Sequence, residues 1–567
     1  MKDSLIIAAV FLFSLVIMQC GGDSIPESNV IWREDFNSDS LKGWTVVDLA
    51  PREKSDWHVY EGYLVHTSNI GGAERLGSHI VAGDAGWRDY TVRSEFVSTD
   101  DDYIGILFRY RDPDNYYRFY VSGQNGIIFL EKRVNGEIVE LASAEEPLEF
   151  CKMSLAAAVH RDRIRVYLND REYFNIRDNS HPAGKVGLMT CYNEGAYFDN
   201  ITVSAYHKMR EQHETVRPER RCGPYLQNVL GDSATIMWQT NLPYGSVVEY
   251  GLEQEPQHRI EAPGLHTVHE VRLHGLMPGT QYFYRVISDT LVSDWYSLRT
   301  MPAGTEKFRF ALYGDSQNNF IVHKKIAAQM AKHQPDFIVS VGDLAHGGRR
   351  ADWTTEFFCP MQDILTSVPV YVSVGNHAYG SPHFTEYFDF PESSHETYYS
   401  IQVGNAYFIF LDNARTAYPD KKYYTDIKAG SPEYDWLVKE LSSPAAQNAE
   451  WLFVVAHVPC YSEYSDVEYP ENVSSFVPLY ERYHVDAVFS GHIHVYERGI
   501  ADGVCYVISG GSGGRLDFNK YRDIDEIQVT RTGHHFCIVD IEGGKMTLRQ
   551  YGIDGVLRDS FSIDKSK

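Results

Sequence analysis

Side chains that bind metal ions follow short apolar runs at several places in the second half of the chain. One such motif, Gly491-His492-Ile493-His494, follows the apolar run Val485–Phe489. On an extended backbone, two residues separated by one other point the same way. The two imidazoles could each hold one ion of a close pair, or they could be surface histidines in a loop.

Four earlier apolar runs end in the same way. They are Phe308–Tyr313 before Asp315 and Gln317, Asp336–Val341 before Asp343, Val368–Val374 before Asn376 and His377, and Trp451–Ala456 before His457. In open α/β sheets, ligands collect beyond the carboxyl ends of strands. Oxygen donors mixed with imidazole suit Fe, Mn or Zn. We therefore expect these strand ends to converge on one metal site, although a single Asp here could also cap a turn.

The elements that position these residues predict an α/β domain over residues 305–567. Helical patterns lie at Val322–Lys332 and Tyr434–Leu441 between the strand patterns. Later β patterns at Val504–Ser509, Phe536–Ile541 and Lys545–Tyr551 would complete a second sheet.

The order of motifs resembles a known family of enzymes. Asp, Gly-Asp, Gly-Asn-His, a single His and Gly-His-x-His follow one another over Asp315–His494, as in the calcineurin-like metallophosphoesterases. The next residues, Val495-Tyr496-Glu497-Arg498, resemble the purple acid phosphatase form. The resemblance implies a four-layer αββα sandwich and a metal-dependent, acid phosphatase-like phosphoric ester hydrolase that uses metal-activated water. It also implies two metal ions bridged by Asp343, with Asp315 and His494 on the first ion and Asn376, His457 and His492 on the second.

The same resemblance leaves the first ion short of one ligand. Purple acid phosphatases place a Tyr three residues after the bridging Asp, where this chain has His346. Other metallophosphoesterases place a His two residues after the first Asp, where this chain has Gln317. A Tyr hydroxyl reaches roughly 6.5 Å from its Cα and a His nitrogen only about 4.5 Å. We therefore expect Gln317 to be the ligand and His346 to face water or phosphate.

Other residues near these motifs have expected roles in catalysis and in substrate binding. By resemblance, His377 lies outside the metal ions and acts as the general acid. Its usual acidic neighbour is replaced by Ala378, and residues 458–467 lack the second His of purple acid phosphatases. Arg349 and Arg515 could hold a phosphate group or could be solvated surface charges.

The first half of the chain predicts two all-β sandwiches before the α/β domain. Residues 30–206 read as a jelly roll that resembles concanavalin/laminin-G-like sandwiches, with strands at Tyr90–Val97, Ile104–Tyr110, Tyr116–Val121, Ile127–Glu131 and Ile164–Leu168. Aromatic residues such as Tyr116 and Tyr117 could stack on a glycan or pack within the sheets. Residues 207–221 are expected to be a linker. Residues 222–301 resemble the fibronectin-III-like domain that precedes the catalytic domain of purple acid phosphatases.

The polar linker has a consequence for the first sandwich. A complete sandwich pattern that ends in a linker predicts an independently folding unit. We therefore expect residues 30–206 to be dispensable for hydrolysis of a small phosphoester.

The N-terminus predicts export from the cytoplasm. In residues 1–20, Lys2 precedes the apolar run Leu5–Met18, which is too short for an ordinary membrane span. The segment resembles a bacterial lipoprotein signal peptide with Cys20 as the lipid-bearing residue, followed by a tether over residues 21–29. We expect a protein of the cell envelope that is anchored to the membrane by this lipid; a plain secreted protein is the alternative.

Net charge bears on possible partners. The 567 residues carry a formal charge of −25, which disfavours nucleic acid as a ligand. The prediction is an exported phosphomonoesterase with two ions of Fe, Mn or Zn. Two alternatives stay open: a phosphodiesterase with the same site, and a glycan-binding surface protein whose phosphatase domain has lapsed.

Overall fold

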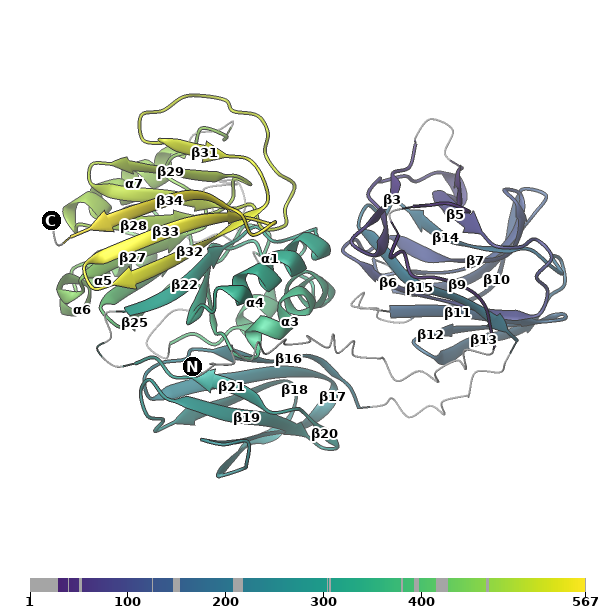
Figure 1. Cartoon of the computed structure of the whole chain (residues 1–567), viewed down its shortest axis with the longest axis horizontal. Helices are drawn as coiled ribbons and strands as arrows, with labels where there is room; N and C mark the ends of the chain where they lie inside the picture. The colour runs from purple at the N-terminus through teal and green to yellow at the C-terminus, as the bar shows by residue number, and fades with distance from the viewer. Residues whose placement is uncertain are drawn as a thin grey trace, which may run out of the picture.

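The computed structural model describes residues 29–565, apart from residues 39, 50–53, 125, 146–152, 207–217, 303, 305–306, 379–380, 392–396, 415–426 and 466–468. The expected export signal, Cys20, most of the tether and most of the linker lie outside these residues. Two all-β sandwiches and an α/β domain follow one another along the chain (Figure 1). The predicted fold class is thereby confirmed. Within the described part of the chain, no helix combines the length and apolarity needed to cross a membrane.

The first sandwich consists of two antiparallel sheets. One sheet has the order β13 (Arg171–Arg177), β12 (Arg163–Leu168), β11 (Met153–His160), β6 (Tyr90–Ser98), β15 (Ala196–Ala205), β4 (Tyr63–His66) and β3 (Trp57–Tyr60), with β1 (Val30–Glu34) beside β15. The other has the order β10 (Glu137–Glu145), β9 (Ile127–Val134), β8 (Asn115–Ser122), β7 (Tyr103–Asp112), β14 (Lys185–Cys191), β5 (Ser78–Ala82) and β2 (Thr45–Asp48). The five predicted strands therefore form, with ends within three residues of those expected.

Both faces of the central strand β8 are buried. Tyr117 packs in the core between the sheets, where its ring stacks on Phe108. Tyr116 faces the other way and is equally buried beside Tyr120 and Phe129. Tyr116 and Tyr117 therefore pack within the domain and are not exposed platforms for a sugar.

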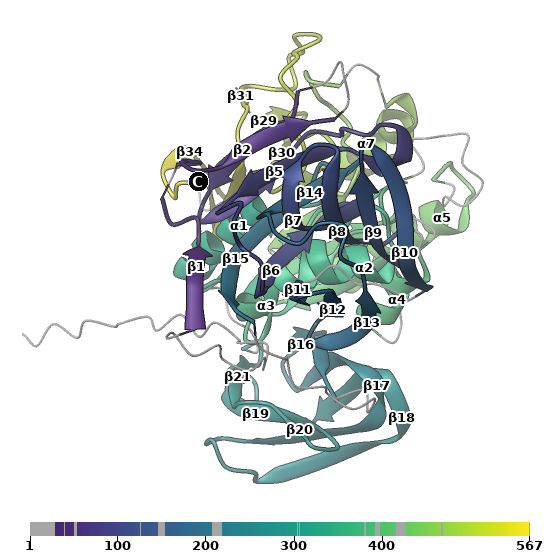
Figure 2. The same ribbon diagram turned by 90° about the vertical axis from the view of Figure 1, so that its right-hand side faces the viewer.

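The second sandwich is smaller and supports the α/β domain. Its sheet has the order β16 (Arg220–Gln227), β17 (Ser233–Gly251), β19 (Gln281–Ser288) and β20 (Leu291–Val292), with β18 (His258–His274) beside β17 and β21 (Tyr296–Arg299) beside β19. Two tyrosine hydroxyls of this domain, from Tyr225 and Tyr284, donate to the carbonyls of Tyr387 and Thr366 in the α/β domain, at 2.9 and 2.8 Å. Figure 2 shows this unit below the other two.

The α/β domain contains two sheets packed face to face. The first has the order β24 (Val370–Val372), β23 (Phe337–Ser340), β22 (Lys307–Tyr313), β32 (His535–Glu542), β33 (Lys545–Gly552) and β34 (Leu557–Asp564). The second has the order β25 (Tyr399–Val403), β26 (Ala406–Leu411), β27 (Trp451–Ala456), β28 (Ala487–Ser490), β30 (Val504–Ser509), β29 (Tyr496–Ala501) and β31 (Val529–Arg531). A core rich in aromatic residues, including Phe310, Phe408 and Phe453, fills the space between them.

Helices cover the outer face of each sheet and complete four layers. The first sheet is covered by α1 (Phe320–Lys332), α2 (Arg350–Asp352), the π-helical segment Trp353–Phe358, α3 (Cys359–Leu365) and α4 (Pro382–Tyr387). The second is covered by α5 (Pro432–Leu441), α6 (Pro444–Asn448) and α7 (Pro470–Arg482). Strands β22, β23 and β24 are mutually parallel, as are β26, β27, β28 and β30. Their carboxyl ends carry the expected metal ligands.

Candidate metal centre

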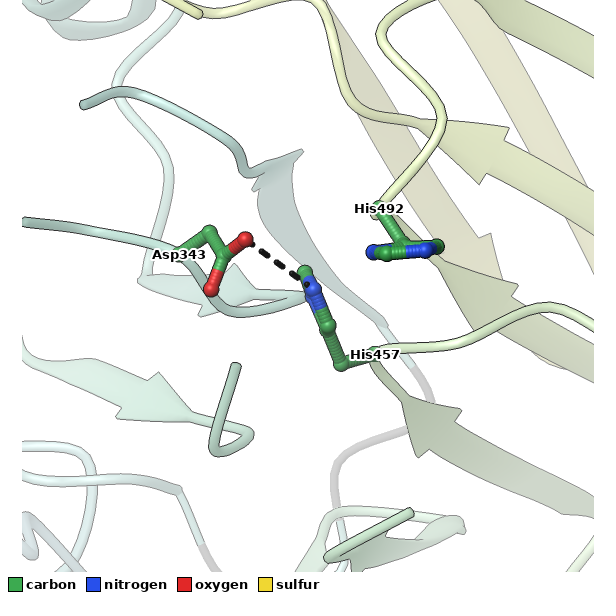
Figure 3. Close-up of side chains that lie close together, drawn as sticks. All are labelled: Asp343, His457 and His492. Carbon is green, nitrogen blue, oxygen red and sulfur yellow. Dashed lines mark ion pairs between the residues drawn. The ribbon is translucent and has the colours of Figure 1, made fainter. Parts of the chain in front are cut away.

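Three ligand candidates from separate strand ends meet at one point. The side-chain oxygen Oδ1 of Asn376 lies 2.9 Å from Nε2 of His457 and 2.8 Å from Nδ1 of His492. One carboxylate oxygen of Asp343 lies 3.2 Å from the same Nε2 of His457. Asp343, His457 and His492 can bring one ligand atom each within 4.8 Å of one another (Figure 3). This group matches the expected second metal position together with the expected bridging residue.

A backbone carbonyl decides which nitrogen of His457 faces the group. Nδ1 of His457 donates to the carbonyl of Val341 at 2.8 Å. A hydrogen bond at one ring nitrogen fixes the tautomer and leaves the other nitrogen for a metal ion. Burial opposes a charge on His457, but Asp343 outweighs it and raises the pKa of His457 to about 9. Burial and the charge of His457 lower the pKa of the adjacent His492 to about 3.

Three further candidates lie beside the first group. Nε2 of His494 is 3.6 Å from Oδ1 of Asp315 and 3.4 Å from the side-chain amide of Gln317. Nδ1 of His494 donates to the carbonyl of Arg515 at 2.6 Å, so Nε2 faces the carboxylate. Burial opposes a charge on His494, but the contact with Asp315 raises its pKa to about 9. Burial and the nearby charge of Asp343 raise the pKa of Asp315. These residues match the expected first metal position.

The backbone at three ligand candidates is left-handed. Asp315, Asp343 and His492 have φ of 54°, 50° and 68°. Such values are uncommon outside glycine, and they cluster where surrounding structure holds a functional site in place. Glycines beside the candidates allow the close approach: a Cβ on Gly375 would lie 2.1 Å from Oδ1 of Asp343, and one on Gly491 would lie 2.2 Å from Oδ2 of Asp315.

The residues present fit a pair of metal ions. Among the residues that the structure describes, the side-chain oxygen of Gln317 has no hydrogen-bond partner, and it is buried. A buried polar atom without a partner is costly, and an ion would satisfy it. Carboxylates, amide oxygens and imidazoles together form a donor set that suits Fe, Mn or Zn.

His377 and His346 lie at the open side of the group. The backbone N–H of His377 donates to Asp343 at 2.8 Å, and its Nδ1 donates to the carbonyl of His346 at 2.9 Å. Nε2 of His377 lies 4.0 Å from Asp343, beyond hydrogen-bond distance. The rings of His346 and His377 have centroids 4.6 Å apart. His377 thus lies beside the ligand candidates, outside the group of Asp343, His457 and His492.

The two arginines expected near substrate have different surroundings. Arg349 pairs with Asp352 at 2.8 Å and with Asp101 of the first sandwich. Its guanidinium therefore already has two carboxylate partners. Arg515 is exposed, and its carbonyl orients His494 as described above.

Two carboxylates at the site were missed by the sequence reasoning. Glu356 is buried in the π-helical segment and accepts from the backbone N–H groups of His346, at 2.7 Å, and Asn318, at 3.2 Å. Burial and Asp352 raise the pKa of Glu356 to about 8. Asp517 accepts from the backbone N–H of His494 at 2.8 Å. Neither belongs to a strand-end motif, so the pattern of strand ends held no signal for them.

Comparison with known proteins agrees with this geometry. Residues 308–496 match the family model described as calcineurin-like phosphoesterase. This part of the chain is a calcineurin-like phosphoesterase domain. Residues 224–300 match the purple acid phosphatase N-terminal domain, and residues 31–204 match the 3-keto-alpha-glucoside-1,2-lyase-like domain. The resemblance to purple acid phosphatases is confirmed at the level of domains.

Individual relatives match only part of this chain, at low sequence identity. Purple acid phosphatase 21 of Arabidopsis thaliana is 28% identical over 250 residues, which are 41% of this chain and 53% of that protein. The Fe(3+)-Zn(2+) purple acid phosphatase 12 of the same plant is 26% identical over 49% of this chain and 66% of its own length. This chain thus spans about half of the length of the first relative.

A solved structure shares the fold. The purple acid phosphatase PPD1 from yellow lupin (Lupinus luteus) seeds has a TM-score of 0.56 at 16% identity, covering 88% of this chain and 95% of that chain. At this identity the likeness shows the fold alone.

Proposed function

We propose that this protein hydrolyses phosphate monoesters at a dinuclear metal centre. The convergence of Asn376, His457 and His492 on one point beside Asp343 carries the proposal. The calcineurin-like phosphoesterase domain supports the reaction class, and an Fe(3+)-Zn(2+) enzyme among the relatives supports the choice of Fe and Zn, with Mn as the other candidate.

The two metal positions divide the ligand candidates. Asp315, Gln317 and His494 would hold the first ion; Asn376, His457 and His492 would hold the second; the carboxylate of Asp343 would bridge them. When bound, such a pair supplies an activated water and stabilises the oxygens of an in-line displacement. Backbone carbonyls orient His457 and His494 so that Nε2 of each is available to an ion.

His377 is the proposed general acid. Its Nδ1 is occupied by the carbonyl of His346, which fixes the ring and leaves Nε2 to carry the proton for the leaving oxygen. Its backbone N–H donates to Asp343, so the acid and the bridging residue are held at a constant separation. Residues 458–467 contain no second His, so we assign acid catalysis to His377 alone.

Substrate contacts are assigned by position. The His346 ring lies against the His377 ring, so it would face a bound phosphate group. Arg515 is exposed beside His494 and would add a positive charge at that side. Arg349 is a weaker candidate because Asp101 and Asp352 compete with a phosphate for its guanidinium.

A substrate panel tests the proposal. Protein reconstituted with Fe, Mn or Zn would be assayed with an aryl phosphate, an alkyl phosphate and the matching diesters. Monoester hydrolysis that chelation abolishes and metal restores is the expected result. Faster diester turnover would favour the phosphodiesterase alternative. Absence of any metal-dependent turnover would leave the lapsed, glycan-binding alternative.

The first sandwich and the N-terminus have proposed roles outside catalysis. The match of residues 31–204 to a glucoside lyase-like domain supports glycan binding by this sandwich. Binding of labelled oligosaccharides to the whole protein would test it. We also propose export with a lipid on Cys20; mass spectrometry of the N-terminal peptide, with and without Cys20→Ser, would test this.

A further inference from the structure

The first sandwich contacts the segment that immediately follows Gln317. The hydroxyl of Thr99 donates to the backbone carbonyl of Asn318 at 3.0 Å. The hydroxyl of Tyr197 lies 3.5 Å from the side-chain oxygen of Asn319, which also caps helix α1 by accepting from the N–H of Val322. One domain therefore supplies hydrogen bonds to the loop that carries a ligand candidate of the other.

An apolar contact between the first sandwich and helix α1 lies beside these hydrogen bonds. Tyr197, Val65 and Val97 of the sandwich form a buried cluster with Phe320 and Ile321 at the start of α1. Lys325, one turn further along α1, pairs with Glu61, and its ammonium lies 5.0 Å from the ring centre of Tyr60. In Figure 1 this helix lies on the side of the α/β domain that faces the sandwich. The first turns of α1 are therefore packed against both domains.

A second contact, an ion pair, joins the first sandwich to the loop that carries His346. Asp101 of the sandwich pairs with Arg349, three residues after His346. Arg349 also pairs with Asp352 at 2.8 Å. The ion pair thus joins the sandwich to the loop on the substrate side of the proposed site.

Asn318 links the Thr99 contact to the loop that carries His346. Its backbone N–H donates to Glu356, its carbonyl accepts from Thr99, and its side chain lies 3.2 Å from Nδ1 of His346. Its φ of 69° is left-handed, a conformation that Asn adopts more readily than most residues and that these three contacts hold in place here. Loss of the Thr99 contact would let this peptide relax and would shift the neighbouring Gln317. Displacements of about 1 Å are enough to cost a site much of its activity.

We propose that Thr99 and Asp101 of the first sandwich are positioning residues for the first metal position and for His346. They act through Asn318 and Arg349 and touch neither metal nor substrate. This inference rests on the proposed function, because it takes Gln317 as a ligand. It also reverses the sequence-based expectation that residues 30–206 are dispensable for hydrolysis of a small phosphoester.

Thr99→Val tests the first contact in the full chain, because it removes the hydroxyl and keeps the shape. We expect the affinity for one of two ions, titrated into metal-free protein, to weaken roughly tenfold or more, as for other residues that orient ligands. The second ion should bind as in wild type. Ser143→Ala is the matched control, since the Ser143 hydroxyl donates to Glu140 on the exposed strand β10.

A charge exchange tests the second contact. Asp101→Arg and Arg349→Asp should each raise KM. The double variant should restore KM in part, because the pair between positions 101 and 349 is re-formed in reverse while the pair with Asp352 stays lost. Asp162→Arg is the control, since it breaks the exposed pair with Arg177 in the same sandwich. If Arg349 bound substrate directly, the double variant would not recover.

The outcomes separate this inference from the proposed function. Wild-type protein that binds two ions, with Thr99→Val and Asp101→Arg matching it in affinity and KM, would overturn the positioning role alone. Wild-type protein that binds no metal would overturn both. Thermal melts of every variant distinguish a local change at one ion from general unfolding.

Discussion

Nε2 of His457 lies 3.2 Å from a carboxylate oxygen of Asp343, and both side chains are buried (Figure 3). Burial opposes a charge on either group, but the opposite charge of the partner outweighs it. The pKa of His457 is therefore raised to about 9, and the pKa of Asp343 is held below its usual range. In the metal-free protein, a proton on His457 occupies the place that an ion would take.

Metal binding should consequently release protons. His457 and His494 both have a pKa of about 9 in the metal-free protein, so both are protonated at pH 7.5. An ion needs neutral imidazole, so the apparent affinity should rise with pH and level off above about 9. Calorimetric titration in buffers of different ionisation enthalpy measures the protons released. His457→Asn should reduce that number, and binding without any proton release would contradict the assignment.

Asp343→Asn should abolish both metal retention and hydrolysis. The amide keeps the shape of the side chain and still accepts from the N–H of His377, but it loses the charge that a bridging ligand supplies. Metal analysis after desalting should find neither ion. Glu542→Gln is the control because Glu542 is an exposed carboxylate of the same domain. Wild-type turnover by Asp343→Asn would refute the site assignment.

His377→Ala should lower kcat by roughly 10²–10⁴-fold, the usual range for a positioned acid. The loss should be larger for an alkyl phosphate than for a nitrophenyl phosphate, because a poor leaving group depends more on protonation. Metal content should stay at the wild-type value, since His377 is assigned as the acid and lies outside the group of Asp343, His457 and His492. Loss of an ion from this variant would instead make His377 a ligand.

Much of the site could be predicted because its residues follow strands. Asp343 and Asn376 follow β23 and β24, parallel neighbours whose carboxyl ends meet at one edge of the first sheet. His457 follows β27 of the second sheet and joins them because the two sheets pack face to face. The glycines of Gly-Asn-His and Gly-His-x-His could also be identified from the sequence, because they belong to the same strand-end motifs. Their missing Cβ atoms leave room for the carboxylates of Asp343 and Asp315.

The contacts of the first sandwich could not be predicted in this way. Thr99 and Asp101 lie in a loop, more than 200 residues from the segments they contact, and no periodic pattern marks them. Tyr116 gave an ambiguous signal for a related reason. A strand whose two faces are both buried carries no polar alternation to tell an exposed aromatic residue from a packed one.

The proposed ligand role of Gln317 leads to the last prediction. Its side-chain oxygen is buried and has no hydrogen-bond partner within the described part of the chain, and its amide nitrogen lies 3.4 Å from Nε2 of His494. His346 lies against the His377 ring instead. A neutral amide oxygen is a weaker ligand than imidazole for later transition metals, so Gln317→His should tighten binding of the first ion. Equilibrium dialysis against Zn would measure the change.

His346→Ala is the companion variant, and it separates the two candidate ligands. Because His346 is assigned to the substrate side, its removal should leave two ions bound and raise KM. The iron-loaded enzyme should also lack a tyrosinate absorption band, since Gln317 and His346 stand at the two positions considered for that ligand. Loss of one ion from His346→Ala would reverse the assignment. A tyrosinate band in the wild type would require a ligand from elsewhere in the chain.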